Sequence, residues 1–337
     1  MSEIHTLPLH TSRISRRLFY YRRIFKAYLT PDVSHLTFWH DVPEVNSHFR
    51  PGELGEYYMP FVVKADYVGE RDSSGIPLLN YHGQVGLQYN PIAVAQFGLG
   101  NYNLWQRTAQ PERQRRFLAA ADWLVSNLEL NPAGRWVWNH HFDWEYRTPL
   151  KAPWYSALAQ GQGVSLLVRA HKHTGKEEYQ DAARRAFDSF TERVEEGGVT
   201  FIDDQGNSWF EETIVTPPTH ILNGFLWASW GVYDYHLHTG DQRARTLFDE
   251  AVRTLKANLG SFDTGFWSLY EQAGVALPML ASSFYHRLHI VQLRVMHKLT
   301  QEEIFREYAD RWEHYTKVFI HRTRAFVQKC LFKLLYY

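Results

Sequence analysis

A succession of helix-length segments separated by short turns is the feature that most constrains this fold. After Pro111, apolar side chains recur at helical spacing up to Asn131. Similar segments follow at 154–174, 178–195, 219–238, 242–258, 284–299 and 301–319, and glycine-bearing turns such as 174–175 and 239–241 separate several of them. Helix pairs joined by short turns, with no competing parallel-sheet pattern, predict a mainly α fold built as an incomplete (α/α) toroid.

The rest of the chain divides around that predicted toroid. Segment 34–81 is rich in Pro, Gly, Asn and short apolar runs, and predicts a small strand-and-loop extension. Residues 199–202 and 265–270 are brief strand-like pieces between helices. We therefore expect an N-terminal extension over 1–80, the toroid over 81–320, and a basic, apolar tail over 321–337.

Both ends of the chain have basic amphipathic character. Residues 15–29 mix arginine and lysine with Leu, Phe and Tyr, and the tail from 320 has a similar pattern. Neither end contains the 18 or so uninterrupted apolar residues of a membrane-spanning helix, and the N-terminus lacks a signal-peptide pattern. We expect a cytoplasmic protein whose ends pack on the domain, with peripheral contact to an anionic membrane as the alternative.

Composition and motifs exclude several functional classes. Lys plus Arg and Asp plus Glu both number 36, so no net field attracts nucleic acid. The single cysteine, Cys330, excludes a disulfide framework, and phosphate-binding and dinucleotide-binding glycine motifs are absent. Paired histidines lack a third ligand at suitable spacing, so we expect no metal and no cofactor. The 12 Trp, 20 Tyr and 21 Phe offer stacking surfaces for rings.

Polar and aromatic side chains gather in four segments, 81–102, 153–169, 209–224 and 267–293. Amides supply both donors and acceptors, which suits ligands with hydroxyl groups. The candidate hydroxyl-binding residues are Gln88, Tyr89, Tyr155, Gln160, Gln162 and Asn223. On a helix, Tyr285, His289 and Gln292 would share one face, which predicts either a polar cleft or a buried Tyr-His hydrogen-bond network.

Five stretches taken together resemble the D-glucuronyl C5-epimerase family, whose members convert D-glucuronate into L-iduronate within heparosan-type chains. They span about residues 80–315 in the family's order: YNPIAVAQFGLGNY, PWYSALAQGQGVSLLVRA, WFEET with PPTHILNGFLWASWGVYDY, LFDEAVRTLKANLGSFDTGFWSLY, and FYHRLHIVQL with IFREYADRW. The resemblance implies a helical toroid that bears the active site and works without a cofactor. It also implies that the large β-domain of the animal enzymes is truncated or missing.

The implied reaction removes the C5 proton next to a carboxylate and returns a proton to the opposite face. The carboxylate charge must be offset in the enolate-like transition state, and two proton carriers must flank the ring. By resemblance, Tyr285 and Tyr270 match catalytic tyrosines of the family and Glu212 matches its glutamate. Tyrosine has a pKa of about 10, and the resemblance implies that neighbouring cations lower it so that tyrosine can act as a base near neutrality.

The chain departs from the family pattern beside that glutamate. Thr213 stands where the family has tyrosine, and Ile214 replaces a proline. Threonine is too weak an acid to carry the proton, so either another group fills the second face or the activity has changed. Glu212 and His220 are the local candidates. Arginines that animal members have near the positions of Ala273 and Ser282 are also absent, which suggests an unsulfated chain or another uronan.

The remaining candidate contacts to substrate lie in the same matched region. Arg147, Lys151 and Arg287 could hold a carboxylate, although such a residue is more often a solvated surface charge than a ligand. His286 and His289 belong to the tyrosine-bearing stretch and are further candidates. We expect a uronic-acid polysaccharide as partner and no nucleic acid, and we leave a homodimer open.

Two other functions fit the same residues. A polysaccharide lyase would use the same proton abstraction but would expel the C4 oxygen, and the sequence does not separate it from an epimerase. A catalytically silent uronan-binding protein could have kept the cleft and lost the chemistry at Thr213. Uronate C5-epimerisation through a C5 carbanion or enolate is our leading hypothesis.

Overall fold

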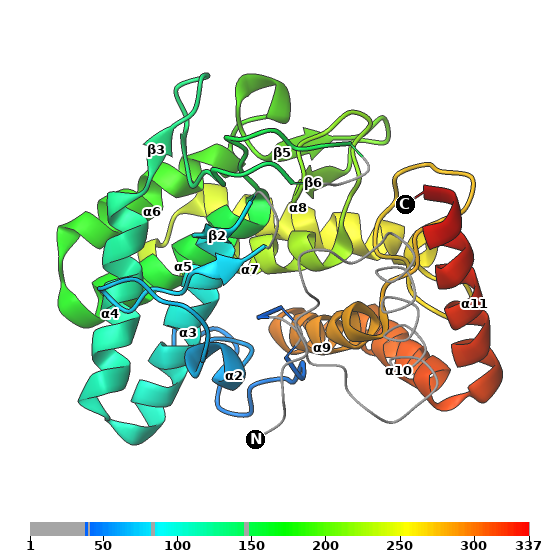
Figure 1. The fold of residues 1–337 in the computed structure, drawn as a ribbon, viewed down its shortest axis with the longest axis horizontal. Coiled ribbons are helices and arrows are strands. Elements are labelled where there is room, and N and C mark those ends of the chain that lie inside the picture. The colour runs from blue at the N-terminus through cyan, green and yellow to red at the C-terminus, as the bar shows by residue number, and fades with distance from the viewer. Residues whose placement is uncertain (1–37, 40, 82–84, 145–147, 337) are drawn as a thin grey trace.

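Consecutive helix hairpins form the body of the protein (Figure 1). The structure, a computed structural model, describes residues 38–39, 41–81, 85–144 and 148–336, so the basic segment 15–29 and Arg147 lie outside the described residues. The hairpin helices are α3 (Pro91–Thr108), α4 (Pro111–Ser126), α5 (Ala157–Thr174), α6 (Glu177–Phe187), α7 (Leu222–Thr239), α8 (Gln242–Asn258), α9 (Ser283–Thr300) and α10 (Glu303–Lys317).

The first helix of each hairpin lies inside and the second lies outside. The inner helices α3, α5, α7 and α9 contact one another in that order, and α4, α6, α8 and α10 each pack on the inner helix before them. The inner helix α5 is buried from Ala157 to Ala170, whereas α8 buries only one face. This alternation of inner and outer helices confirms the predicted mainly α, incomplete (α/α) toroid.

Helices α5 and α7 approach each other closely because glycines line their contact. A Cβ atom on Gly161 would lie 2.6 Å from the Cα atom of Ala228, and one on Gly231 would lie 2.1 Å from the carbonyl oxygen of Gly161. Any larger side chain would force the two backbones apart. The cost of glycine inside a helix is therefore offset by packing, as expected for Gly161 from the sequence.

Local chemistry explains where the inner helices begin. The side chains of Asn90, Ser156 and Ser282 accept backbone N–H groups of the first turns of α3, α5 and α9. Helices α5 and α7 end at Gly175 and Gly240, whose positive φ angles suit glycine. The predicted segments therefore match most of these helices, except that α5 and α7 each start three residues late and that α4 and α6 end early, at Ser126 and Phe187.

The short strands differ from those that the sequence suggests. The expected piece at 199–202 is confirmed as β5 (Thr200–Ile202), which pairs antiparallel with β6 (Ser208–Phe210). The expected strand at 265–270 is wrong, because this segment makes only isolated bridges at Ser268 and Leu269. The other strand pairs are β1 (Leu79–Asn80) with β2 (Leu87–Gln88), and β3 (Glu129–Leu130) with β4 (Trp136–Val137).

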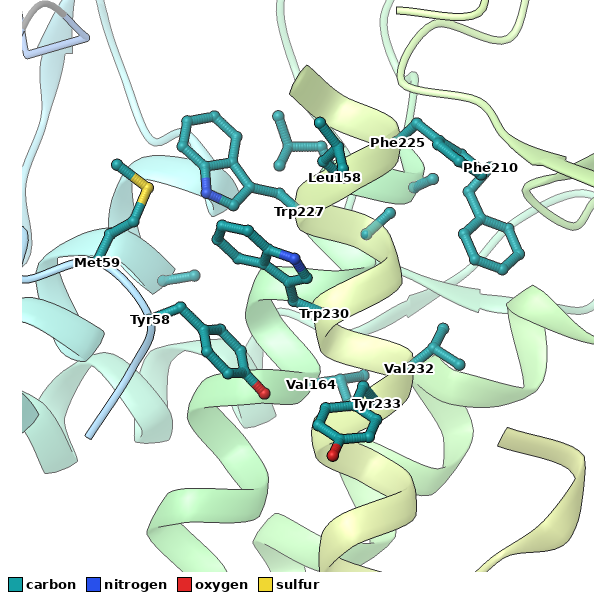
Figure 2. Packing of buried hydrophobic residues seen from close by; sticks show 14 of the residues in the cluster. Tyr58, Met59, Leu158, Val164, Phe210, Phe225, Trp227, Trp230, Val232 and Tyr233 are labelled. Atoms are coloured by element: carbon teal, nitrogen blue, oxygen red, sulfur yellow. The ribbon is translucent and has the colours of Figure 1, made fainter. Parts of the chain in front are cut away.

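The described part of the N-terminal extension packs into the toroid, between α3 and α9 (Figure 1). It carries the short helix α2 (Val62–Ala65), which contacts α3. The Tyr58 hydroxyl donates to the Asp234 Oδ1 atom at 2.7 Å, and Arg169 pairs with the same carboxylate at 2.6 Å, all fully buried. Figure 2 shows Tyr58 beside Trp230 in the core, where the ring centroids lie 5.1 Å apart.

The C-terminal tail forms helix α11 (Phe319–Tyr336), which packs on the loop before α9. The Lys329 ammonium donates to the carbonyl oxygen of Leu280 at 2.6 Å, and the Gln328 amide donates to that of Pro278 at 3.3 Å. The tail thus supports the loop that leads into α9. In the described part of the chain, no helix combines the length and apolar character needed to cross a membrane.

Candidate functional site

The N-terminal ends of α5, α7 and α9 meet at one rim of the toroid. Hydrogen bonds join the starts of two of these helices to neighbouring loops. The Ala157 N–H at the start of α5 donates to the carbonyl oxygen of Glu211 at 2.9 Å, and the Leu222 N–H at the start of α7 donates to that of Tyr270 at 3.1 Å. The loop before α9 is tied down by the Ala281 N–H, which donates to the carbonyl oxygen of Ser268. Helix N-termini carry partial positive charge, so this rim favours anionic groups.

Tyr270 and Tyr285 form a pair at this rim. Tyr270 follows the bridge at Leu269, and Tyr285 lies in the first turn of α9 after the Ser282 cap. Their ring centroids lie 4.9 Å apart in an edge-to-face arrangement. Both side chains are partly exposed. The structure therefore brings together the two tyrosines that the sequence singled out.

Glu212 lies over the first turn of α7, next to the tyrosine pair. The Asn223 Nδ2 atom donates to its Oε2 atom at 3.3 Å. A Cβ atom on Gly224 would lie 2.1 Å from the same oxygen, so glycine makes room for the carboxylate. Burial, helped by the charge of Glu211, raises the pKa of Glu212 to about 8. Near neutral pH its carboxyl group can hold or release a proton.

The expected lowering of a tyrosine pKa is wrong for Tyr285, because its surroundings keep its phenol protonated. Burial raises the pKa of its phenol well above the usual value, the Glu212 carboxylate raises it further, and a hydrogen bond with the Tyr270 side chain lowers it in part. Tyr285 is thus a proton donor beside a group that titrates near pH 8. These shifts give the two groups distinct protonation states at the same pH.

His220 is held by neighbours in its own loop. Its Nδ1 atom lies 2.5 Å from the Glu211 Oε1 atom, its backbone N–H donates to Oε2 of the same carboxylate, and its ring stacks on Trp209 at 4.4 Å. Its φ angle of 47° is unusual for a residue other than glycine. The His220–Glu211 pair therefore fixes the loop that positions Glu212.

Thr213 turns into the protein instead of replacing a proton carrier. The residue is 5% exposed, and its hydroxyl lies 2.8 Å from the Thr219 hydroxyl in a mutual hydrogen bond. This bond closes the loop between Glu212 and His220. Thr213, which departs from the family pattern, therefore makes a local structural contact.

The predicted amide contacts fall into two groups. Gln160 is fully buried: its Oε1 atom accepts the Trp138 N–H at 2.9 Å, and its amide donates to the carbonyl oxygen of Ala186 at 3.1 Å. Gln162 is equally buried and accepts a hydrogen bond from Gln96 at 3.0 Å. Both hold the helices together. Asn223 differs, because it contacts Glu212 directly.

Other predicted contacts are engaged locally near the surface. The Gln88 amide donates to the carbonyl oxygen of Val85, and the Tyr89 hydroxyl donates to Asp72 at 2.8 Å. The Tyr155 hydroxyl donates to the carbonyl oxygen of Gly197 at 3.0 Å. Lys151 is exposed and pairs with Asp143 at 2.5 Å. None of these bonds joins the residue to the pair of tyrosines.

His286 and His289 of α9 lie in a buried hydrogen-bond network through Ser268, whereas the sequence offered a Tyr-His network as the alternative to a cleft. His286 stacks on Trp267 at 3.8 Å, its Nδ1 atom contacts Ser268, and its Nε2 atom contacts the carbonyl oxygen of Trp312. His289 is fully buried and also contacts the Ser268 hydroxyl. Burial lowers the pKa of both rings, which keeps them neutral. The neighbouring Arg287 is exposed.

Two residues near the rim were not found from the sequence. Gly224 gives Glu212 its space, and only its place in the first turn of a helix could have indicated such a role. Lys329 is a buried lysine of α11, 5% exposed, and nothing in the surrounding sequence pattern marks it. Among the residues described, no group of three or more His, Cys, Asp or Glu side chains could hold a metal ion.

Comparison with known proteins identifies a family model and relatives that are similar to this chain. The model of the D-glucuronyl C5-epimerase C-terminus matches residues 131–314, more than half of the chain. The D-glucuronyl C5-epimerase of Caenorhabditis elegans is 36% identical over 234 residues, which are 64% of this chain and 38% of that enzyme. An uncharacterised protein of Methanocaldococcus jannaschii is 31% identical over 179 residues, 52% of this chain and 56% of that protein.

The chain spans less than half of the length of the first relative and little more than half of the second. Among solved structures, the unsaturated glucuronyl hydrolase of Bacillus sp. GL1 has a TM-score of 0.45 at 14% identity, over 68% of this chain and 62% of that one. A family 76 glycoside hydrolase (mannosidase) of Bacteroides thetaiotaomicron has a TM-score of 0.45 at 13% identity, covering 89% and 84%.

The match to the family model includes Glu212, Tyr270 and Tyr285, which the fold gathers at one rim. The chain therefore belongs to the D-glucuronyl C5-epimerase family.

Proposed function

We propose that the protein epimerises D-glucuronate to L-iduronate at C5 within a uronic-acid polysaccharide, with Glu212 and Tyr285 as the two proton carriers. The observation that carries this proposal is the juxtaposition of a carboxyl group whose pKa is raised to about 8 with a phenol that stays protonated. A base and an acid with well-separated proton affinities are what a two-sided proton exchange at one carbon requires.

In the proposed reaction, the ionised Glu212 carboxylate removes the C5 proton, and the electron pair of that bond moves into the sugar carboxylate as an enolate. The Tyr285 hydroxyl then donates its proton to C5 from the other face. The sugar has the same atoms and charge before and after, with C5 inverted. Tyr270, edge-on to Tyr285, stabilises the phenolate through the hydrogen bond between them.

The difference between the pKa values of Glu212 and Tyr285 also explains how the site returns to its starting state. After one turnover Glu212 holds a proton and Tyr285 has lost one. Because the phenol is the weaker acid of the two, the proton moves favourably from Glu212 back to Tyr285. The Glu212 carboxylate raises the pKa of Tyr285, so the two groups interact electrostatically, and we propose that water carries the proton between them.

The test is isotope exchange on a defined polymer. The protein is incubated with heparosan in deuterated water, and deuterium at C5 is measured by NMR while ultraviolet absorbance is followed. The proposal predicts C5 deuterium and iduronate signals without absorbance. A rise in absorbance would indicate an unsaturated product and a lyase, and absence of exchange on heparosan and on other unsulfated uronans would refute the epimerase proposal.

A pair of tyrosine-to-phenylalanine variants tests whether the reaction takes place at this site. Tyr285→Phe keeps the ring and removes only the hydroxyl, so the rate of iduronate formation should fall by about three orders of magnitude or more while polymer binding is retained. The same change at Tyr179, whose hydroxyl bonds Asp122 between the outer helices α6 and α4, is the control and should leave the rate unchanged. Equal rates in wild type and Tyr285→Phe would remove Tyr285 from the mechanism.

A further inference from the structure

Helix α11 buries a lysine against the loop that leads into α9 (Figure 1). Ala325, Lys329 and Phe332 share one face of α11 through i, i+4 and i+7 spacing, and all three are buried, with Lys329 only 5% exposed. The family model matches residues 131–314, so α11 lies outside that match. Buried lysines are almost always paired, so the partners of Lys329 indicate what it does.

The Lys329 ammonium holds the chain segment that pairs with Tyr270. It donates to the carbonyl oxygen of Leu280 at 2.6 Å. Leu280 forms an antiparallel bridge with Leu269, the residue before Tyr270. The Tyr270 N–H in turn donates at 2.8 Å to the carbonyl oxygen of Met279, the residue before Leu280. Lys329 therefore fixes the segment to which the Tyr270 backbone is hydrogen-bonded.

The charge of Lys329 also acts on the residue after Tyr270. The Glu271 carboxyl group is 2% exposed, and burial raises its pKa to about 7, while the Lys329 charge lowers that pKa in part. At pH 8, where Glu271 is largely ionised, the ammonium therefore offsets part of the cost of a buried carboxylate. Lys329 thus stabilises the chain on both sides of Tyr270, because it holds the partner of Leu269 and favours ionised Glu271.

Hydrogen bonds to α7 and to the loop before it hold the other side of the same backbone. The Leu222 N–H donates to the carbonyl oxygen of Tyr270 at 3.1 Å, and the Gln272 N–H donates to that of Thr219 at 2.7 Å. These bonds tie the Tyr270 segment to the toroid. On the side of the 277–281 segment, the anchor is Lys329 of α11.

The position of Tyr270 matters because its side chain contacts Tyr285. The two ring centroids lie 4.9 Å apart, and the hydrogen bond between the side chains lowers the pKa of Tyr285 in part. In the proposed reaction this bond stabilises the Tyr285 phenolate. A displacement of about 1 Å at such a group can cost about 100-fold in rate, so the anchor of the Tyr270 backbone bears directly on catalysis.

We infer that Lys329 is a positioning residue of the candidate active site, which from α11 holds Tyr270 in place against Tyr285. Lys329 acts through the Tyr270 backbone and touches no substrate. The inference rests on the proposed function for the role of the two tyrosines. It gives α11, a helix outside the family match, a part in the reaction.

The experiment is a double-mutant cycle on iduronate formation from heparosan at pH 8, with kcat and KM measured separately. Lys329→Met keeps a long unbranched side chain and removes the ammonium, so kcat should fall by about tenfold to hundredfold while KM changes by less than about threefold. Tyr270→Phe has already lost the hydroxyl that bonds Tyr285, so in that background Lys329→Met should lower kcat by less than about twofold. An equal loss in both backgrounds would overturn the inference.

Amide hydrogen exchange gives a second readout, which does not depend on turnover and decides if Tyr270→Phe is inactive. In Lys329→Met the N–H groups of residues 268–281 should exchange about tenfold faster, whereas those of α5 should exchange as in wild type. Unchanged exchange at 268–281, or an equal increase throughout the protein, would overturn the inference. If Lys329→Met does not fold, Lys329→Gln, whose uncharged amide can still donate a hydrogen bond, replaces it in both measurements.

Lys317→Met is the matched control. Lys317 ends α10, its side chain is 67% exposed, and it pairs with Glu313 at 3.4 Å. Its replacement should leave kcat, KM and amide exchange at 268–281 unchanged. A loss of kcat in Lys317→Met as large as that in Lys329→Met would show that removal of any lysine in this region slows the reaction, and would overturn the inference.

The two readouts separate the failure of this inference from that of the proposed function. Normal iduronate formation by wild type and by folded Lys329→Met refutes the role of Lys329 and leaves the epimerase proposal standing. No turnover of heparosan or of other unsulfated uronans by wild type refutes the epimerase proposal. Amide exchange at 268–281 in Lys329→Met then decides by itself whether Lys329 anchors Tyr270.

Discussion

Replacing Glu212 with glutamine should stabilise the protein while removing its activity. The folded protein raises the pKa of this carboxyl group from the ordinary 4.5 to about 8, chiefly through burial. Glu212 therefore favours the folded state fully below about pH 4.5, and that contribution is lost as the pH rises to about 8. Glutamine has nearly the same shape but cannot ionise, so the variant avoids the cost of holding a buried carboxylate.

The size of this effect follows from the two pKa values. At pH 7 the unfolded carboxyl group is ionised and the folded one is largely protonated, a difference worth about 3 kcal/mol at about 1.4 kcal/mol per pH unit. Above pH 8 the full shift of Glu212 corresponds to about 5 kcal/mol. With an unfolding entropy of about 2 cal/mol/K per residue, 3 kcal/mol raises the melting temperature by about 5 °C.

The assay is thermal and urea unfolding of wild type and Glu212→Gln at half-unit steps from pH 5 to pH 8. The stability difference between them should be under about 1 kcal/mol at pH 5 and grow by about 3–4 kcal/mol by pH 8. Asp181→Asn is the control, because its carboxyl group pairs with Arg184 and has a lowered pKa, so its effect should stay constant over this range. A pH-independent difference for Glu212→Gln would refute the reasoning.

Further predictions concern neighbouring residues. Gly224→Ala places a methyl group where the Glu212 carboxylate lies, so C5 exchange should fall at least about tenfold with near-normal folding by circular dichroism. Thr213→Tyr overpacks a buried position and should cost about 1–3 kcal/mol in urea unfolding without raising the exchange rate; a faster enzyme would show that the missing tyrosine matters. Arg169→Met leaves the Asp234 carboxylate buried and unpaired, and should lower the unfolding free energy by about 3–5 kcal/mol, whereas an unchanged midpoint would contradict the assigned ion pair.

The helical fold was predictable because helix periodicity and turn chemistry agree along most of the chain. The segment at 242–258 was predicted with the bounds of α8, since Asp241 caps its start and the apolar face repeats without interruption. Helix α3 was missed because Gly98 and Gly100 weaken its pattern. Those glycines are explained only in three dimensions, where a Cβ atom on Gly100 would lie 2.5 Å from the carbonyl oxygen of Phe61.

The candidate site was predictable only where a family motif marked it. The motifs named Glu212 and both tyrosines, and the fold brings them to one rim. They could not distinguish Gln160, a fully buried amide bonded to backbone and side-chain groups of the core, from a residue that faces a ligand. Lys329 escaped notice because its burial depends on the loop before α9, which no local pattern records.

The most direct test of the two-carrier account is the initial rate of C5 deuterium exchange, measured for glucuronate-only and iduronate-containing polymer with wild type, Glu212→Gln and Tyr285→Phe. The account predicts exchange from both polymers by wild type, rising with pH through about 8 as Glu212 ionises, no exchange from the glucuronate-only polymer by Glu212→Gln, and no inversion at C5 by either variant. Inversion by either variant, or glucuronate exchange by Glu212→Gln, would contradict it.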